Sequence, residues 1–255
     1  MRSIPTPTVL RAALVAAFLA AAGPALAEGP KDAAGGIATA RAKAVHAPFD
    51  IVRTRITTEG KQLMFQMQVS GKAGRLRPTK TGQLAGSKVF SYVWPTSLDP
   101  AEVGFEAKAG ILAFAVTAHP DFDDTPLFDE NGDGKLKNDG GVWHSHWVVL
   151  QPDEACGKGA LKVVDIPEGS QPRLPKTWPG LPLLIDSPGW SPLFAGDRVS
   201  VRVPFDDVAA HAQAKFDGVT AALRVNASMH NPLLCVAQVF KVASGDLSLP
   251  GGIDR

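Results

Sequence analysis

Short runs in which hydrophobic and polar residues alternate occupy most of this chain. An alternation with a period of two is typical of β-strands that bury one face. The runs FDIVRTRIT (49–57) and QLMFQMQVSG (62–71) flank the turn TEGK, which predicts a β-hairpin. Further runs predict strands at residues 88–94, 103–110, 111–118, 143–150, 160–166, 198–204, 220–229 and 233–242.

Helical periodicity is confined to one short segment, FDDVAAHAQAKF (205–216). The chain also contains 25 glycines and 21 prolines, which disfavours a doubly wound α/β fold. Three stretches, 119–141, 151–160 and 166–197, have no regular pattern and predict long loops. We therefore expect an all-β, β-sandwich-like single domain with long irregular loops and at most one or two short helices.

The first residues have the pattern of a secretory signal. Arg2 and Arg11 precede the apolar run ALVAAFLAAAG, which is too short to span a bilayer, and PALAEG follows it. Small residues at Ala25 and Ala27 predict cleavage after Ala27, so residues 1–27 are interpreted as a signal peptide and 28–255 as the domain. A retained membrane anchor is the alternative. The signal predicts a periplasmic, secreted or cell-surface protein without a membrane span.

Charge and cysteine content narrow the function further. The net charge of +1 argues against electrostatic binding of nucleic acid or of an acidic membrane surface. The chain has two cysteines, Cys156 and Cys235, which we expect to form a disulfide in an oxidising compartment. Two buried free thiols, or a thiolate metal site, are the alternatives.

The loop HPDFDDTPLFDENGDGKLKNDGG (119–141) resembles the first half of a D-x-N-x-D-G calcium loop. Ca²⁺ prefers six to eight oxygen ligands, and alternate acidic or amide side chains supply them while a glycine allows the turn. The predicted calcium ligands are Asp129, Asn131, Asp133, Lys135 (through its carbonyl) and Asp139. The twelfth position is Gly140 instead of glutamate, so Asp139, or Asp121, Asp123 and Asp124, would have to complete the site. A solvated loop of Asx turns is the alternative.

The run GVWHSHWVVL (141–150) carries the candidate chemistry. On a strand, His144 and His146 share one face, while Trp143, Ser145 and Trp147 share the other. Two imidazoles on one face can reach one ion, and imidazole suits copper, zinc, nickel and iron. The alternative is a pair of half-buried polar residues that hydrogen-bond across a sheet.

A third ligand has to come from elsewhere in the chain. The remaining histidines are His46, His119, His211 and His230. His211 lies in the expected helix and is the least attractive. His230 lies on the polar face at the end of a predicted strand and is the preferred ligand, with His119, at the start of the acidic loop, as the alternative.

Residues 110–150 resemble the MopE/CorA-type copper-binding surface proteins of methane-oxidising bacteria, through HPDFDDTPLFDENGDG and NDGGVWHSHWVVL. The resemblance implies a β-rich, secreted, non-enzymatic protein with calcium and a Cu(I) site. In that family two histidines and a tryptophan oxidised to kynurenine form the site, and His230 would be the distant histidine. The family's W-x-H spacing is missing here, because His144 occupies the position of the tryptophan. A site of His144, His146 and His230 without kynurenine follows, and zinc becomes a competitor of copper.

Three functions fit these observations. The first is copper binding for uptake, storage or buffering, with metal ions and a copper-transport protein as partners. The second is a three-histidine metalloenzyme, a hydrolase or copper oxidase, with a carboxylate such as Asp121, Asp123 or Glu154 as base. The third is a calcium-stabilised module for sugars or other small ligands, with Trp94, Trp178 and Trp190 as stacking surfaces.

Overall fold

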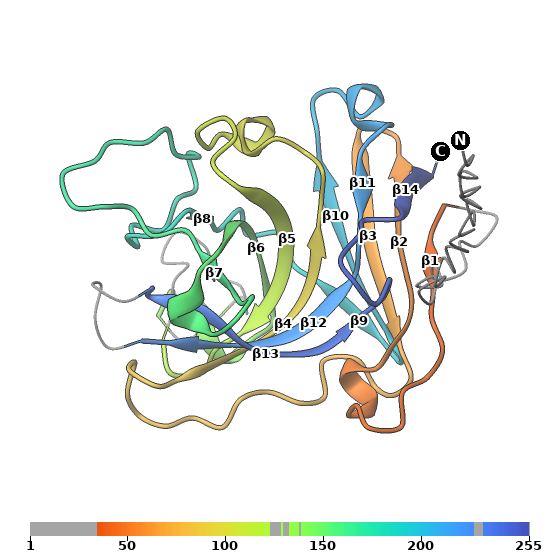
Figure 1. Cartoon of the computed structure of the whole chain (residues 1–255), viewed down its shortest axis with the longest axis horizontal. Coiled ribbons are helices and arrows are strands. Elements are labelled where there is room, and N and C mark those ends of the chain that lie inside the picture. The colour runs from red at the N-terminus through yellow and green to blue at the C-terminus, as the bar shows by residue number, and fades with distance from the viewer. Residues whose placement is uncertain (1–34, 123–128, 130–132, 138, 227–231, 255) are drawn as a thin grey trace, which may run out of the picture.

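The structure is a computed structural model that describes residues 35–122, 129, 133–137, 139–226 and 232–254. Its regular elements are almost all β-strands, and none of the described residues forms an α-helix. The strands build two sheets that pack face to face, as Figure 1 shows. The predicted all-β, sandwich-like fold is therefore confirmed. The expected signal peptide lies outside the described residues.

The first sheet has the strand order β11-β14-β2-β3-β10-β9. A further short strand, β1, also pairs with β2. Its strands are β1 (Ile37–Ala38), β2 (Ile51–Glu59), β3 (Gln62–Val69), β9 (Leu193–Ala195), β10 (Arg198–Pro204), β11 (Lys215–Phe216) and β14 (Gly251–Asp254). β2 and β3 form the predicted hairpin, with Glu59 opposite Gln62. β14 runs parallel to β2, whereas the other pairs are antiparallel.

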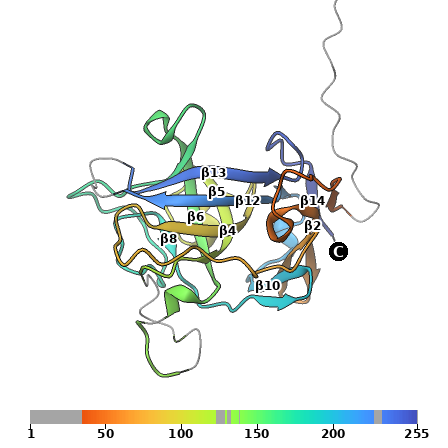
Figure 2. The same cartoon turned by 90° about the horizontal axis from the view of Figure 1, so that it is seen from below.

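The second sheet closes on itself. Its strands are β4 (Lys88–Pro95), β5 (Ile111–Ala118), β6 (His144–Pro152), β7 (Leu161–Val163), β8 (Ile185–Asp186), β12 (Val219–Val225) and β13 (Leu234–Val242). The order β5-β4-β12-β13-β7-β6 is completed by a direct β5–β6 pairing, and β8 adds to β6. We call this ring of strands the closed sheet; Figure 2 shows it beside the first sheet.

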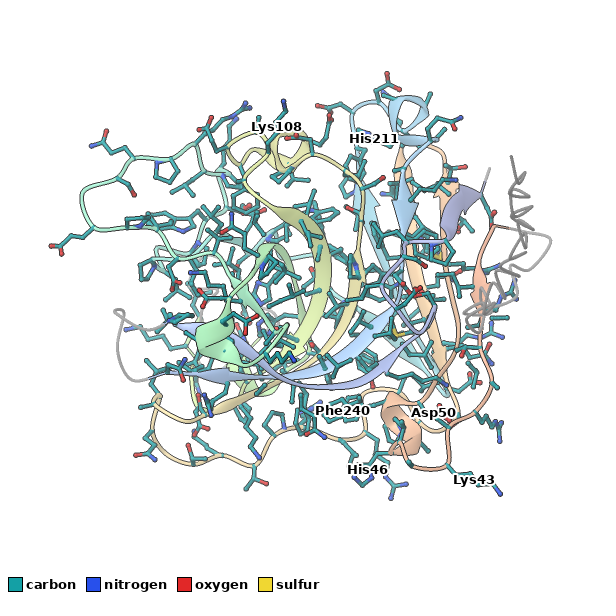
Figure 3. All side chains as sticks on the ribbon, in the orientation of Figure 1. Lys43, His46, Asp50, Lys108, His211 and Phe240 are labelled. Carbon is teal, nitrogen blue, oxygen red and sulfur yellow. A yellow bond between two sulfur atoms is a disulfide. The ribbon has the colours of Figure 1, made fainter. Side chains whose placement is uncertain are left out.

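Two hydrophobic cores follow from this arrangement. One lies between the sheets and contains the large aromatic side chains, among them Phe65, Trp94 and Phe114. The other lies inside the closed sheet and consists of aliphatic side chains such as Val148, Val163 and Leu223. Figure 3 shows side chains filling the space between the sheets. The strands β4, β5 and β6 are buried on both faces for this reason.

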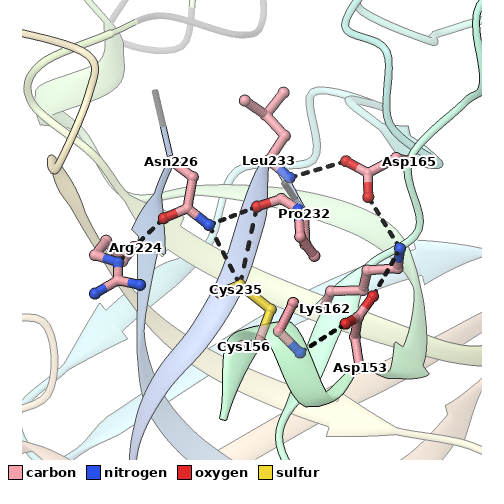
Figure 4. The surroundings of a disulfide bond; sticks show 10 residues. Asp153, Cys156, Lys162, Asp165, Arg224, Asn226, Pro232, Leu233 and Cys235 are labelled. Carbon is pink, nitrogen blue, oxygen red and sulfur yellow. Dashed lines mark hydrogen bonds and ion pairs between the residues drawn. A yellow bond between two sulfur atoms is a disulfide. The ribbon is translucent and has the colours of Figure 1, made fainter. Parts of the chain in front are cut away.

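The predicted disulfide is present and helps to close the sheet. Cys156 lies in the short 3-10 turn Glu154–Cys156, and its partner Cys235 lies in β13. Their Cα atoms are 5.3 Å apart, and no other cysteine exists in the chain. Beside the bond, Lys162 of β7 contacts both Asp153 and Asp165 (Figure 4).

Two predicted elements are wrong. Residues 103–110 do not form a strand, because Gly104 and Lys108 adopt positive φ values of 102° and 58°, which a strand excludes. Asp99 instead caps the turn Pro100–Val103 and accepts the Lys108 N–H. The expected helix at 205–216 forms only the 3-10 turn Ala209–His211. Its last residue, Phe216, belongs instead to β11, where it pairs with Gly251 of β14 and is buried. The remaining 3-10 turns are Ala47–Phe49 and Asp139–Gly141.

Candidate metal centre

Strands β5 and β6 bring three histidines together at one end of the closed sheet. The strands are antiparallel, with Thr117 opposite His144 and Ala115 opposite His146. His119 follows the last residue of β5, and its N–H donates to the Gly140 carbonyl at 2.8 Å. Residues far apart in the sequence thus meet because the chain leaves β5 and returns in β6 beside it.

The predicted division of β6 into two faces is confirmed. His146 points into the closed sheet, where it lies beside Val148 and Leu150. Trp143 and Trp147 point the other way and belong to the core between the sheets. Trp143 also donates from Nε1 to the Gly74 carbonyl at 2.9 Å. The tryptophans therefore have a packing role, while the histidines face the site.

The three imidazoles form a compact, buried cluster. His119, His144 and His146 are each no more than 2% exposed. One nitrogen of each ring can be chosen so that the three atoms lie within 4.8 Å of one another. Within the described part of the chain, no other group of three or more histidines, cysteines or carboxylates has this geometry. The cluster could hold a metal ion.

Hydrogen bonds at Nδ1 orient all three rings. His119 Nδ1 lies 2.7 Å from the Phe122 carbonyl oxygen, and His144 Nδ1 lies 3.0 Å from that of Val142. His146 Nδ1 lies 3.1 Å from Ser187 Oγ and 3.3 Å from the Asp186 carbonyl oxygen. A carbonyl oxygen only accepts, so Nδ1 of His119 and Nδ1 of His144 carry the hydrogen. Metal-binding histidines are oriented in this way, with the second nitrogen donating to a backbone carbonyl or carboxylate.

The opposite nitrogens of His119 and His144 face each other closely. Their Nε2 atoms are 2.6 Å apart. With hydrogen on Nδ1, each neutral ring has a lone pair at Nε2, and two lone pairs repel at this separation. A shared cation removes the repulsion: either a proton, which leaves one imidazole charged in a buried site, or a metal ion.

Two residues, Phe122 and Gly140, support His119 from two sides. Phe122 stacks on the His119 ring, with the centroids 4.3 Å apart and the planes inclined by 12°. Gly140 passes so close that a Cβ atom there would lie 1.9 Å from the Phe122 carbonyl oxygen. The absence of a side chain at this position, which removes the usual twelfth calcium ligand, is therefore required by packing beside His119.

Asp186 of β8 is a buried carboxyl residue whose backbone carbonyl lies next to His146. Burial raises its pKa to about 6, although hydrogen bonds from Thr177 and the Ser187 N–H act in the opposite direction. Its carboxylate accepts from Thr177 Oγ1 at 2.6 Å. Because Asp186 pairs with Trp147 across β6 and β8, its side chain lies on the tryptophan face of the sheet and away from the histidines.

The structure separates the other histidines from this cluster. His46 is exposed beside the turn Ala47–Phe49, and His211 lies 3.8 Å from Glu102 in another part of the molecule. Figure 3 labels both at opposite ends of the view. His230, the preferred third ligand from the sequence, lies outside the described residues. His119, the alternative, is the histidine that completes the cluster.

The sequence contains a signal that places His119 beside His144. The alternation in 111–118 places Ala113, Ala115, Thr117 and His119 on one face. Pairing this strand with 143–150 in an antiparallel hairpin would have put His119 beside His144. Phe122, Gly140 and Ser187 carried no comparable signal, because their roles depend on how loops return to the sheet.

The predicted calcium ligands are only partly described. Asp129 accepts the N–H groups of Asp133 and Gly134 at 3.1 and 2.6 Å, and Asp133 accepts that of Lys135 at 2.8 Å. The Asp133 contact is an Asx turn, whereas Asp129 accepts from residues four and five positions further on. Asp139 is buried in the turn Asp139–Gly141, whereas Asp133 is exposed. Asn131, Asp123 and Asp124 lie outside the described residues, and Asp121 binds the Thr81 and Gly82 N–H groups.

A cavity of about 330 Å³ adjoins the histidine cluster inside the closed sheet, and His119 and His146 are part of its wall. The tryptophans expected to stack on sugars are buried or half-buried. Trp94 is fully buried, with its Nε1 donating to Thr54 Oγ1 at 2.9 Å, so it cannot stack on a ligand. Trp178 and Trp190 are half-buried.

Comparisons of the chain with models of protein families, with curated proteins and with solved structures gave no match. Within the described residues, no helix is both long and apolar enough to cross a bilayer.

Proposed function

We propose that this protein binds one copper ion on His119, His144 and His146, in the periplasm or outside the cell. Uptake, storage or buffering of copper would be its role, and a copper-transport protein its partner. The disulfide is compatible with such an oxidising compartment. The expected signal peptide and the resemblance to the MopE/CorA-type proteins support the same location.

One observation carries the metal part of this proposal. The Nε2 atoms of His119 and His144 lie 2.6 Å apart while both Nδ1 atoms point to carbonyl oxygens. This arrangement favours a cation between the rings. A metal ion accepts lone pairs from several rings at once, and His146 is near enough to add a third nitrogen. A proton, by contrast, can be shared by only two nitrogen atoms.

Copper is preferred over zinc for two reasons. Nitrogen ligands bind Cu²⁺ more tightly than other divalent ions of the first transition row, including Zn²⁺. The resemblance to copper-binding surface proteins implies the same metal. Kynurenine is not needed, since His144 supplies an imidazole where that family has the modified tryptophan. His230 stays a candidate for a further ligand.

Calcium in the loop from Asp129 to Asp139 is a second part of the proposal. Its support is the D-x-N-x-D-G pattern and the position of the loop directly before β6. A calcium ion that binds only the folded protein would stabilise it by mass action. Chelation should therefore lower the melting temperature of the wild type, and the double variant Asp129→Ala/Asp133→Ala should lack that response. An equal response of both proteins to chelator would exclude this calcium site.

A three-histidine metalloenzyme is the second candidate. The cavity beside His119 and His146 favours it, because a catalytic metal needs room for a substrate. The wall of the cavity argues against a hydrolase, since Lys158 is its one charged side chain among the described residues and no carboxylate is there to act as base. Binding is therefore preferred over hydrolysis.

Elemental analysis of the full-length protein, purified from its native host without added metal, tests the proposal. We expect close to one copper per chain and little zinc. Purified apoprotein offered equal amounts of both ions should also take up copper. Stoichiometric zinc that copper does not displace would favour the enzyme, and absence of both metals would contradict a metal function.

A further inference from the structure

The interior of the closed sheet contains a cavity that its own side chains do not fill. Its volume is about 330 Å³. Protein interiors are packed as densely as organic crystals, and voids much larger than a water molecule are rare. The wall is formed mainly by aliphatic residues from every strand of the closed sheet, among them Val89, Ala115, Val148, Val163, Ala221 and Leu234.

Two alanines explain part of the empty volume. Ala115 of β5 and Ala221 of β12 point into the closed sheet and are 3% and 2% exposed. The neighbours of Ala221 on the same face of β12, Val219 and Leu223, are larger. A leucine at either alanine position would extend into the cavity. The space is therefore a consequence of which side chains the strands carry, as well as of the width of the sheet.

Three polar side chains gather at one end of this largely apolar space. Thr117, His119 and His146 line the cavity there. Thr117 is 7% exposed, and its Oγ1 has no hydrogen-bond partner among the residues that the structure describes. The other hydroxyl of the wall, on Ser91, donates to the Ala221 carbonyl at 3.1 Å. A buried hydroxyl without a partner is costly, so Thr117 points to a ligand that supplies one.

The cavity reaches the surface where the closed sheet is incomplete. β7 is three residues long and pairs with β13 only through Lys162 and Cys235. Beyond this pair the cavity is bordered by Lys158 and by Val239 and Leu247, which are 49% and 39% exposed. Exposed apolar side chains at a rim are typical of an entrance for an apolar molecule.

We propose that this cavity binds a small aliphatic molecule with a single oxygen-bearing end, which lies at Thr117 beside the histidine cluster. A dry apolar cavity of about 150 Å³ holds one benzene molecule, so about 330 Å³ suits a molecule of roughly ten non-hydrogen atoms. Medium-chain fatty acids and alcohols have this size and shape. The inference goes beyond copper binding and does not require a bound metal.

The test is calorimetric titration of the metal-free, full-length protein with octanoate and, separately, with 1-octanol. Saturable binding with one site and a Kd on the order of 100 µM is expected for a ligand of this size. Butanoate, which would leave most of the cavity empty, should bind much more weakly. The acid and the alcohol distinguish a carboxylate from a hydroxyl as the preferred end.

Substitutions at Ala221 and Thr117 locate the ligand, and a substitution at Ala210 is the control. Ala221→Leu fills the cavity and should weaken binding of both compounds at least tenfold, while Ala210→Leu, an exposed site in the turn Ala209–His211, should not change it. Ala221→Val is the milder form if the leucine variant is not folded by circular dichroism. Thr117→Val keeps the shape, removes the hydroxyl and should weaken binding about tenfold.

Absence of saturable binding by the wild type, or wild-type affinity in both Ala221 variants, would overturn the inference. Loss of octanoate binding in Lys158→Met together with full binding in Thr117→Val would overturn the placement of the oxygen end. Because these titrations use metal-free protein, they can fail while the copper proposal stands, and the copper proposal can fail while they succeed.

Discussion

Single residues around the histidine cluster act mainly through backbone carbonyl groups. His119, His144 and His146 each direct Nδ1 to a carbonyl oxygen, so the orientation of the rings depends on where the loops place those oxygens. Gly140 is the most sensitive of these loop positions, because a Cβ atom there would meet the Phe122 carbonyl oxygen that His119 uses.

We expect Gly140→Ala to weaken metal binding about 10- to 100-fold, the range typical of lost contacts behind a metal ligand. The methyl group must displace the Phe122 carbonyl oxygen and so disturb His119. Gly141→Ala is the matched control, because a Cβ atom at Gly141 has no neighbour within 4 Å. Competitive titration of both variants would measure the effect, and equal affinities would show that the Phe122 carbonyl does not position His119.

Among the elements, long alternating runs were the most predictable from the sequence. The runs 111–118 and 143–150 are predicted almost to the residue, because each is rich in strand-forming residues over the length of a full strand. The short strands β1, β8, β9, β11 and β14 were not predicted, since a run of two to four residues is too short to show a periodicity. Their pairing depends on contacts with the longer strands, which local pattern does not contain.

The metal site, like the fold, could be predicted only in part from the sequence. The spacing of His144 and His146 indicated a shared face, which depends only on the geometry of one strand. The third histidine depended on the register between β5 and β6 and on the path of the loop between them. Closure of the second sheet, and with it the cavity, was not predictable because it requires β7 to meet both β6 and β13.

The disulfide belongs to this same closure. β7 meets β13 through one residue pair, Lys162 and Cys235, and the bond from Cys235 to Cys156 reinforces it. It closes a loop with a sequence separation of 79 residues, so it should stabilise the fold by about 4 kcal/mol in the chain-entropy model.

The double variant Cys156→Ser/Cys235→Ser should lose free energy of unfolding of that size, as measured by urea denaturation. The wild type under reducing conditions should approach the variant. If the wild type and the double variant unfold with the same free energy, the bond does not stabilise the folded chain.

On the scale of the whole molecule, a buried ion pair joins the two sheets. Asp50, which precedes β2, is 2% exposed and lies 2.6 Å from the Lys241 ammonium group of β13. Phe49 and Phe240, next to them in the sequence, stack with their ring centroids 4.7 Å apart. Figure 3 labels Asp50 and Phe240 in this region.

Burial acts to raise the pKa of Asp50, but hydrogen bonds from Lys241, Ser70 and the Ala42 N–H outweigh it and hold the pKa below its ordinary value of 3.8. Since the pKa is lower in the folded state, the ionised carboxylate stabilises the fold above pH 4. This stabilisation is lost as the pH falls through the folded value.

Lys241→Met should therefore cost about 3 kcal/mol of unfolding free energy at pH 7, because it leaves a buried carboxylate without its cation. The difference from the wild type should shrink as the pH falls below 4. Lys43→Met, at an exposed lysine in the same region, should have little effect at either pH. A constant difference between pH 7 and pH 3 would mean that Lys241 acts by packing and not by charge.

Copper titration of single histidine variants under reducing conditions tests the central claim most directly. We expect His119→Ala, His144→Ala and His146→Ala each to lower copper affinity more than about 100-fold, beyond the loss typical of a contact behind the ligands. Affinity should also fall as the pH drops below about 6.5, where free imidazole is protonated. His46→Ala and His211→Ala, which lie apart from the cluster, should bind as the wild type does. Wild-type copper affinity in the triple variant of His119, His144 and His146 would contradict the proposed site.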